Sequence, residues 1–244
     1  MYKFIYKTAF LLITLLILGC SHDDKSPKTN IITDIVGHVN LYDASTNEVD
    51  HSGMTISISK SDPLISTTTD ASGKFTLEKV PEGTYDLIYE KSGYGTYKVF
   101  DVEHKNDVVT FIEKTPSLGQ KSSTSVTNFT ISSIDEERIF QVATNPQSSI
   151  NSPVYIRLFF GTDETVSNSN YISYSEGLSI QINPSEIKYS TLQLSASLQS
   201  GTTVYVKAYG ESYFSNQYTD PELNKEIFPN LNANTVDAVS FVVP

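Results

Sequence analysis

Apolar and polar residues alternate with a period of two through most of this 244-residue chain. Ile35, Gly37, Val39 and Leu41, for example, share one face of such a segment. Period two is the spacing of side chains on one face of a β-strand, whereas a helix repeats at three and four residues. The abundant Ser, Thr, Val and Ile suit a pleated, half-buried surface. The sequence therefore predicts an all-β protein.

Between residues 33 and 114, the alternating segments are separated by residues that favour turns. In segment 70–73, Asp-Ala-Ser-Gly, the Asp can bond its own backbone and the Gly permits a positive φ. Segment 80–85, Val-Pro-Glu-Gly-Thr-Tyr, is a second predicted turn. About seven short strands separated by such turns are the sequence form of a Greek-key sandwich.

Alternation resumes after residues 115–123, which hold Pro116 and Gly119 and are predicted to be a linker. We therefore expect two consecutive antiparallel Greek-key β-sandwich domains, at 33–114 and 124–244. The predicted strand faces of the second domain are Phe129 and Ile131; Phe140 and Val142; Val154, Ile156, Leu158 and Phe160; Leu178, Ile180 and Ile182; Leu192, Leu194 and Ala196; Val204, Val206 and Ala208; and Val239, Phe241 and Val243.

Several motifs of the first predicted domain resemble the carboxypeptidase regulatory-like domain, a transthyretin-type sandwich. They occur in the family's order at 37–39 (Gly-His-Val), 53–56 (Gly-Met-Thr-Ile), 69–75 (Thr-Asp-Ala-Ser-Gly-Lys-Phe), 80–85 and 93–94 (Gly-Tyr). This resemblance covers about a third of the chain. It implies a structural module that carries no active site.

Residues 198–209 of the second predicted domain resemble the segment of fibronectin type III domains that leads from a turn into a late strand. Tyr205 stands where that family places its tyrosine corner, a hydroxyl that bonds to backbone upstream. The similar stretch is short and the chain has no Trp. An immunoglobulin-like sandwich is therefore the broader expectation for 124–244.

The N-terminus has the form of an export signal. Lys3 and Lys7 precede an apolar run at 9–18, in which Thr14 is the single polar residue. A helix needs about 20 residues to cross a bilayer core, so this run is too short for a permanent span. We expect residues 1–19 to be a cleaved signal peptide.

The run ends in Ile17, Leu18, Gly19 and Cys20, which resemble the lipobox of bacterial lipoproteins. The resemblance implies cleavage before Cys20 and a diacylglycerol thioether on its thiol. Two or more acyl chains give stable anchoring where one chain gives marginal binding. An ordinary secretory leader with an incidental cysteine is the alternative. Cys20 is also the sole cysteine, so the chain has no internal disulfide.

Residues 20–32 are predicted to form a lipidated, flexible tether. Its start resembles the acidic export signal that directs lipoproteins of Bacteroidetes to the outer leaflet of the outer membrane, and consists of Ser21, His22, Asp23, Asp24 and Lys25. The alternative is a solvated linker with incidental charges. The expected location is the outer membrane, with exposure at the cell surface left open.

Charge and motif content restrict the function classes. The net charge is −11, and −13 without Lys3 and Lys7, so nucleic acid is excluded as a partner. No metalloprotease His-Glu-x-x-His, no nucleophile elbow and no phosphate-binding glycine loop occurs. His38 and His51 are predicted to lie at the surface, and the Asp70 turn supplies too few oxygens for calcium. We expect no enzyme activity, no metal and no cofactor.

The remaining candidate site is the long segment 213–234, which carries Tyr213, Phe214 and Tyr218. Long loops of this kind are often functional. These aromatic residues either form a binding loop or pack against the edge of the sandwich. The expected function is a structural or protein-interaction module at the cell envelope, accessory to an outer-membrane complex. A carbohydrate-binding lipoprotein is the alternative, although the absence of Trp removes the broadest stacking surface.

Overall fold

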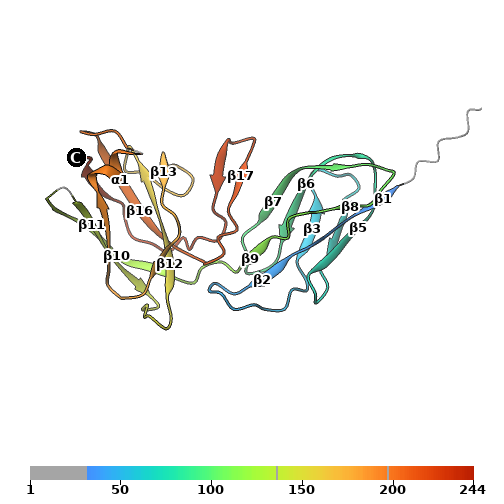
Figure 1. Cartoon of the computed structure of the whole chain (residues 1–244), viewed down its shortest axis with the longest axis horizontal. Helices are drawn as coiled ribbons and strands as arrows, with labels where there is room; N and C mark the ends of the chain where they lie inside the picture. The colour runs from blue at the N-terminus through green and yellow to red at the C-terminus, as the bar shows by residue number, and fades with distance from the viewer. Residues whose placement is uncertain (1–31, 136, 197) are drawn as a thin grey trace, which may run out of the picture. The chain divides into compact units, whose positions relative to one another are not determined.

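The computed structural model describes residues 32–135, 137–196 and 198–244. These residues form strands joined by turns, with one short helix, α1 (Thr191–Ser195) (Figure 1). The predicted all-β sandwich class is thereby confirmed. No helix in the described ranges is long and apolar enough to span a membrane.

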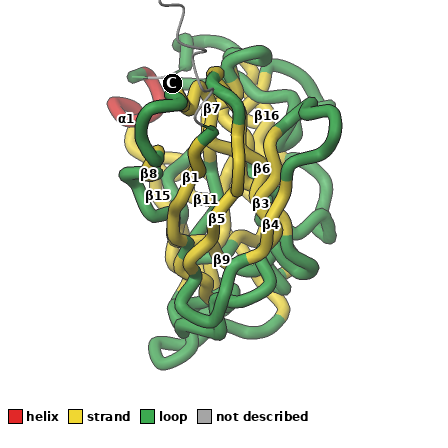
Figure 2. The backbone as a smooth tube through the Cα atoms, turned by 90° about the vertical axis from the view of Figure 1, so that its right-hand side faces the viewer, coloured by secondary structure: helices red, strands yellow, loops and turns green. Residues whose placement is uncertain are grey.

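Two facing sheets enclose the first core, which contains Ile35, Val39, Leu41, Met54 and Ile56 among its buried residues. One sheet has the order β5 (Lys74–Val80), β1 (Thr33–His38) and β8 (Thr110–Phe111), which lie side by side in Figure 2. The other has the order β4 (Ser66–Thr68), β3 (Thr55–Ile58), β6 (Gly83–Glu90) and β7 (Tyr97–His104). All these pairs are antiparallel except β1 with β8.

The second core lies between another two sheets, and Phe140, Val142, Ile156, Leu158 and Val206 are buried in it. One sheet has the order β10 (Ser125–Ile134), β11 (Glu137–Asn145) and β15 (Ser185–Ser190). The other has the order β13 (Ser173–Tyr174), β12 (Val154–Gly161), β16 (Thr203–Glu211) and β19 (Val239–Val242), with β14 (Leu178–Ile180) also paired to β12.

The segment predicted as a linker contains a strand. β9 (Ser117–Gly119) pairs in parallel with β2 (Asn40–Tyr42), and Leu118 is buried in the first core. Lys121 also donates its backbone N–H to the carbonyl of Gly93 at 2.8 Å. The chain therefore stays hydrogen-bonded to the first sandwich for several residues beyond β8.

The strand predicted around Leu192 and Leu194 is wrong, because these residues form helix α1. Ser190 caps the helix: its hydroxyl accepts from the backbone of Gln193, whose side chain accepts from the backbone of Ser190 at 2.9 Å. This reciprocal cap favours a helical turn over an extended chain. Leu194 enters the core, whereas Leu192 is 79% exposed.

Ile182 also departs from its predicted position on a buried face, since it is 68% exposed. Strand β14 ends at Ile180, and the chain then turns toward β11. The side chain of Asn183 exchanges two hydrogen bonds with the backbone of Thr144, at 3.0 and 2.9 Å. An amide that replaces a backbone partner in this way ends the alternation before Ile182.

Two tyrosines of β6 differ in how their hydroxyl groups are satisfied. The Tyr85 hydroxyl donates to the carbonyl of Pro81 at 2.8 Å, and the ring closes over Gly83, where a Cβ would lie 2.9 Å from it. This contact has the form of a tyrosine corner. The Tyr89 hydroxyl is buried in the first core without a hydrogen-bond partner in the structure. Burial raises the pKa of Tyr89 well above its ordinary value.

These two tyrosines provide a matched test of the first sandwich. Tyr85→Phe removes the hydrogen bond to the carbonyl of Pro81 and should lower the free energy of unfolding by about 1 kcal/mol. Tyr89→Phe removes an unsatisfied hydroxyl from an apolar core and should raise it by about 1 kcal/mol. Calorimetric unfolding of both variants measures the difference. An equal loss in both would mean that the Tyr89 hydroxyl has a partner.

Candidate functional site

The long segment after β16 forms an ordered arm, by which we mean residues 213–234. It contains a hairpin of β17 (Tyr218–Asp220) and β18 (Lys225–Ile227), drawn in red in Figure 1. The arm follows β16 of the second sandwich, and near its other end Asn232 donates its backbone N–H to the carbonyl of Gly210 in β16 at 2.9 Å. The segment predicted to be a long loop therefore contains a paired hairpin.

The arm covers the outer face of β12, which would otherwise be exposed to water. Its Phe228 packs with Phe159 and Tyr209 in a third, mainly aromatic core. The ring centroids of Phe159 lie 5.1 Å from Phe228 and 5.6 Å from Tyr209, in edge-on contact. Strand β12 is consequently buried on both faces.

A buried ion pair lies beside this aromatic core. Arg157 on β12 donates its Nε–H to the carboxylate of Glu211 on β16, at 2.9 and 3.0 Å from the two oxygens. The side chains are 5% and 1% exposed. The Arg157 guanidinium also donates to the carbonyl of Ser175 at 2.6 Å, and it lies 4.6 Å from the ring of Phe228.

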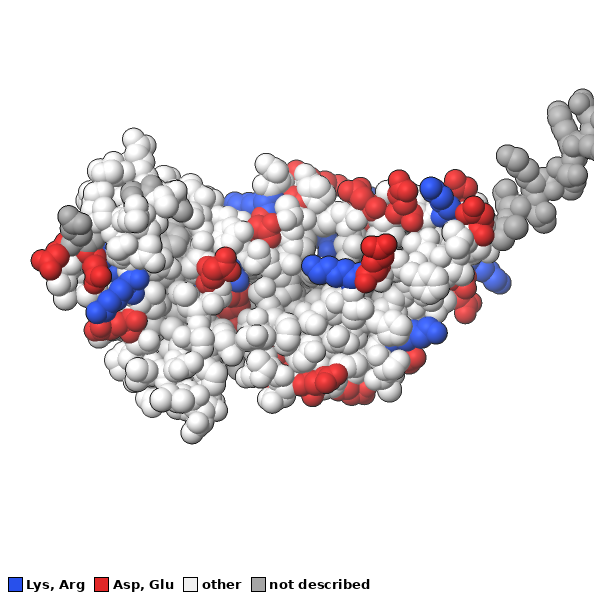
Figure 3. All heavy atoms as spheres, in the orientation of Figure 1, with Lys and Arg blue, Asp and Glu red and all other residues white. Residues whose placement is uncertain are grey.

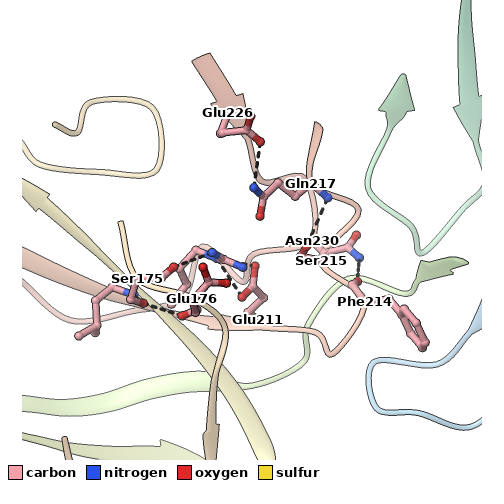
Figure 4. A network of polar contacts seen from close by, with 10 residues as sticks. Ser175, Glu176, Glu211, Phe214, Ser215, Gln217, Glu226 and Asn230 are labelled. Atoms are coloured by element: carbon pink, nitrogen blue, oxygen red, sulfur yellow. Dashed lines mark hydrogen bonds and ion pairs between the residues drawn. The ribbon is translucent and has the colours of Figure 1, made fainter. Parts of the chain in front are cut away.

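Burial raises the pKa of Glu211, and the positive charge of Arg157 opposes that shift. Figure 4 shows Glu211 close to Ser175 and Glu176. Each charged group already has a partner within the fold. The pair therefore serves to hold β12, β16 and the arm together, because a carboxylate held this way is poorly placed for proton transfer to a ligand.

Two asparagines of the arm bind backbone groups of the first sandwich, and we call them the amide clamp. Asn216 accepts from the backbone N–H of Gly119 at 2.8 Å and donates to its carbonyl at 3.0 Å. Asn230 accepts from the N–H of Gly95 at 2.9 Å and donates to the carbonyls of Gly119 and Phe214, at 2.9 and 2.7 Å. Asn216 is 4% exposed and Asn230 is fully buried.

The amide clamp requires glycine at its two contact points. A Cβ on Gly95 would lie 2.4 Å from Pro229, and a Cβ on Gly119 would lie 2.7 Å from the carbonyl oxygen of Phe214. Backbone approaches this close exclude larger residues. Asn216 itself has a φ of +53°, a left-handed conformation that Asn tolerates better than most residues.

The three aromatic residues predicted as a binding loop lie in different surroundings. Phe214 stacks on Tyr42 of the first sandwich with centroids 4.1 Å apart, and Tyr218 lies 6.0 Å from the ring of Tyr97. Tyr213 remains 52% exposed, although its ring contacts Phe214 at 4.9 Å. Of the three, Tyr213 is the one that presents a large free surface.

Tyr213 borders an open groove, which we call the arm groove. Gln217, also in the groove, is hydrogen-bonded to the Glu226 carboxylate at 2.9 Å, as Figure 4 shows. An exposed aromatic ring beside amide, hydroxyl and ammonium groups is suited to binding rather than to bond cleavage. The groove is lined by Tyr97, residues 114–118 and residues 213–217.

The histidines of the described chain are placed as follows. His38 is exposed, as predicted. His51, predicted to lie at the surface, is half-buried: it accepts from the backbone N–H of Leu41 at 2.9 Å and donates to Glu48 at 2.8 Å. His104 is 1% exposed and is bonded to the carbonyl of Val80 and the hydroxyl of Thr110, at 3.0 and 2.8 Å. His51 and His104 thus stabilise loops and strand ends.

The acidic turn at Asp70 is also satisfied internally. Its Oδ1 accepts from the backbone N–H groups of Ser72 and Lys74, at 2.9 and 3.0 Å. The Ser72 hydroxyl also donates to this oxygen, at 2.7 Å. The bond from the hydroxyl is the largest cause of the lowered pKa of Asp70, and the two backbone bonds add to it. No cluster of three or more potential metal-binding side chains was found within residues 32–135, 137–196 and 198–244. The face shown in Figure 3 carries Lys and Arg side chains dispersed among Asp and Glu.

Sequence reasoning missed Arg157, Glu211, Asn216 and Asn230. Arg157 did carry a signal, because it interrupts an otherwise apolar strand that needs a buried partner for any charge. The two asparagines carried none, since Asn is common in loops. The predicted lipidation site and its flanking residues lie outside the described residues: Ile17, Leu18, Gly19, Cys20, Ser21, His22, Asp23, Asp24 and Lys25.

The first sandwich matches a known domain family in sequence. Residues 35–113 match the carboxypeptidase regulatory-like domain. The match covers the strands from β1 to β8 and confirms the resemblance stated for this part of the chain. No curated protein matches the chain in sequence.

The matches among solved structures are distant both in sequence and in structure. A Bacteroides uniformis protein whose description proposes carbohydrate binding has 15% identity and a TM-score of 0.32, over 86% of this chain and 98% of that one. A DUF3823 family protein from Parabacteroides merdae has 11% identity and a TM-score of 0.28, over 75% and 92%. A cohesin-dockerin complex from Acetivibrio cellulolyticus has 20% identity and a TM-score of 0.31, over 37% and 59%. At these TM-scores, none of the three says anything about what this chain binds.

The amide clamp makes a prediction about stability. Asn230→Ala leaves the N–H of Gly95 and the carbonyl of Phe214 buried without this partner, and should lower the free energy of unfolding by about 2–3 kcal/mol. Asn234→Ala, an exposed change in the same arm, should alter it by less than about 0.5 kcal/mol. Calorimetric unfolding of both variants measures the effect. Equal stabilities would contradict a structural role for Asn230.

Proposed function

We propose that this chain is a non-enzymatic, lipid-anchored protein of the cell envelope that acts as a structural or protein-interaction module, accessory to an outer-membrane complex. One observation carries the proposal: Tyr213 stands exposed beside an open groove, while the imidazoles and the carboxylate that the fold encloses hold the structure together. His51, His104 and Glu211 all have partners within the protein. What remains available at the arm groove is a surface for recognition.

The envelope location rests on the sequence of the leader. Ile17, Leu18 and Gly19 before the sole cysteine support cleavage and acylation at Cys20, and residues 21–25 support display at the cell surface. The arrangement of β10, β11 and β15 opposite β12, β16 and β19 supports an immunoglobulin-like or fibronectin type III-like second domain. Tyr205 packs against the third core there.

Acylation is the first part of this proposal to test. The native protein should begin at Cys20 and carry a diacylglycerol group, measured by mass spectrometry of the N-terminal peptide from the membrane fraction. Cys20→Ala should abolish incorporation of labelled fatty acid, whereas Ser21→Ala should retain it. An unmodified Cys20, or a native chain that still begins at Met1, would remove the anchor from the proposal.

The interaction surface predicts a separate result. Tyr213→Ala should weaken binding of an envelope protein partner by at least about tenfold, since an exposed tyrosine at the centre of an interface commonly contributes 2 kcal/mol or more. The matched control is Ile150→Ala, which changes a 77% exposed residue elsewhere. Quantitative recovery of co-purifying protein from envelope membranes provides the measurement. Equal recovery with both variants would exclude the groove as the docking surface.

A carbohydrate ligand is the second candidate, and exposure of the Tyr213 ring is the observation that favours it. The same two variants separate the candidates on affinity gels that contain polysaccharide. Retardation of the wild-type chain that Tyr213→Ala abolishes and Ile150→Ala preserves would support glycan binding. Replacement of Phe214 or Tyr218 would give an ambiguous result, because both pack against the first sandwich.

A further inference from the structure

Three exposed apolar side chains lie close together where the described chain begins. Ile32 is 48% exposed, Val108 58% and Phe111 71%. Exposed apolar residues are ordinary when they are scattered singly, but a contiguous group marks a contact surface. We call these three residues the β8 patch.

Hydrogen bonds and strand pairing bring the β8 patch together. The Thr33 hydroxyl, next to Ile32, donates to the carbonyl of Val108 at 3.0 Å. Strand β8 then runs parallel to β1, with Phe111 opposite Val36. Neighbouring strands lie about 4.8 Å apart, and Ile32 precedes Val36 by four residues of about 3.3 Å each, so the three residues spread over roughly 13 Å along the β8 edge of the sheet that Figure 2 shows.

Alternation along β8 explains why Phe111 points outward. Ile112, the next residue, packs against the first core, so Phe111 takes the opposite face. Lys105 and Asp107 precede Val108 in the loop and Glu113 and Lys114 follow Phe111, so these four charges cancel. Asp34 lies between Ile32 and Val36 on the same face of β1, and its carboxylate accepts from the backbone N–H of Lys79 at 2.8 Å. The patch is therefore apolar side chains around one carboxylate that is bonded to the protein.

The position of the patch along the chain indicates what covers it. Cys20 and Ile32 are twelve positions apart, so the chain between them reaches at most about 40 Å when fully extended. A flexible chain of this length has a root-mean-square span of about 20 Å. An anchor at Cys20 would hold the patch close to lipid at an effective concentration in the millimolar range, which makes a weak apolar contact well populated.

We propose that Ile32, Val108 and Phe111 insert into the lipid surface to which the chain is anchored, so that the first sandwich contacts the bilayer through β1 and β8. This inference rests on the proposed anchor at Cys20. A second copy of the chain is a poorer occupant, because a stable dimer buries about 800 Å² on each partner and three side chains supply only part of that area.

The chain has features that allow a direct test. It contains no Trp and one cysteine, so a single tryptophan is an unambiguous probe and Cys20 is a unique coupling site. The chain beginning at Cys20 is coupled through that thiol to a maleimide phospholipid in phosphatidylcholine vesicles that carry brominated acyl chains. Phe111→Trp provides the probe in the patch. Ile150→Trp, at a residue 77% exposed in the second sandwich, provides the control.

The expected result is a blue shift and a loss of fluorescence for Trp at position 111, with a water-like, unquenched spectrum at position 150. Unquenched emission at both positions on coupled vesicles would overturn the inference. A blue shift at position 111 that appears without vesicles and grows with protein concentration would show self-association instead, and would overturn it too. Coupling is chemical, so this outcome is independent of whether cells acylate Cys20, which the mass spectrometric test decides separately.

Discussion

The arrangement of the arm depends on the need of buried backbone groups for hydrogen-bond partners. Gly95 and Gly119, the last residue of β9, each present an N–H group that is bonded by the arm instead of by a neighbouring strand. An unpaired backbone group there would cost free energy. Asn216 and Asn230 supply the missing donors and acceptors from the arm. Each amide has one donor and one acceptor end, so one side chain reproduces the bonding of a strand neighbour. Hydrogen bonds to buried backbone groups therefore hold the arm in place, in addition to the burial of its apolar side chains.

The buried ion pair is the second constraint on the same segment. Desolvation of Arg157 and Glu211 opposes their attraction, so a buried pair is weak evidence for stability. Its geometry is specific, however, because the planar guanidinium bonds to Glu211 and Ser175 while lying against the ring of Phe228. If the arm followed a different path, the Arg157 guanidinium would lose its contact with the ring of Phe228. We infer that the pair favours one placement of Phe228 over alternatives of similar apolar area.

The sequence predicted those parts of the fold that depend on alternating burial. Ile35, Val39 and Leu41 are buried as expected because period two is a property of every strand with one wet face. Helix α1 escaped prediction because a local cap at Ser190 outweighs alternation over only a few residues. At the site, Tyr213 was recognisable as an aromatic residue in a long loop. The amide clamp was not, because it joins residues that are about a hundred positions apart and has no period.

The structure also couples the fold of the arm to what its groove can recognise. Gly119 accepts close approach by the carbonyl of Phe214, which neighbours Tyr213, and Asn230 bonds to that same carbonyl. Any side chain at position 119 must therefore displace Phe214 and, with it, the ring that is exposed at the groove. A tyrosine side chain has few rotatable bonds, so ordering it in an interface costs little conformational entropy. That cost stays low only when the backbone that carries the tyrosine is already fixed. The glycine and the buried amide supply that fixation, so substitutions deep in the arm should alter recognition without touching the exposed surface.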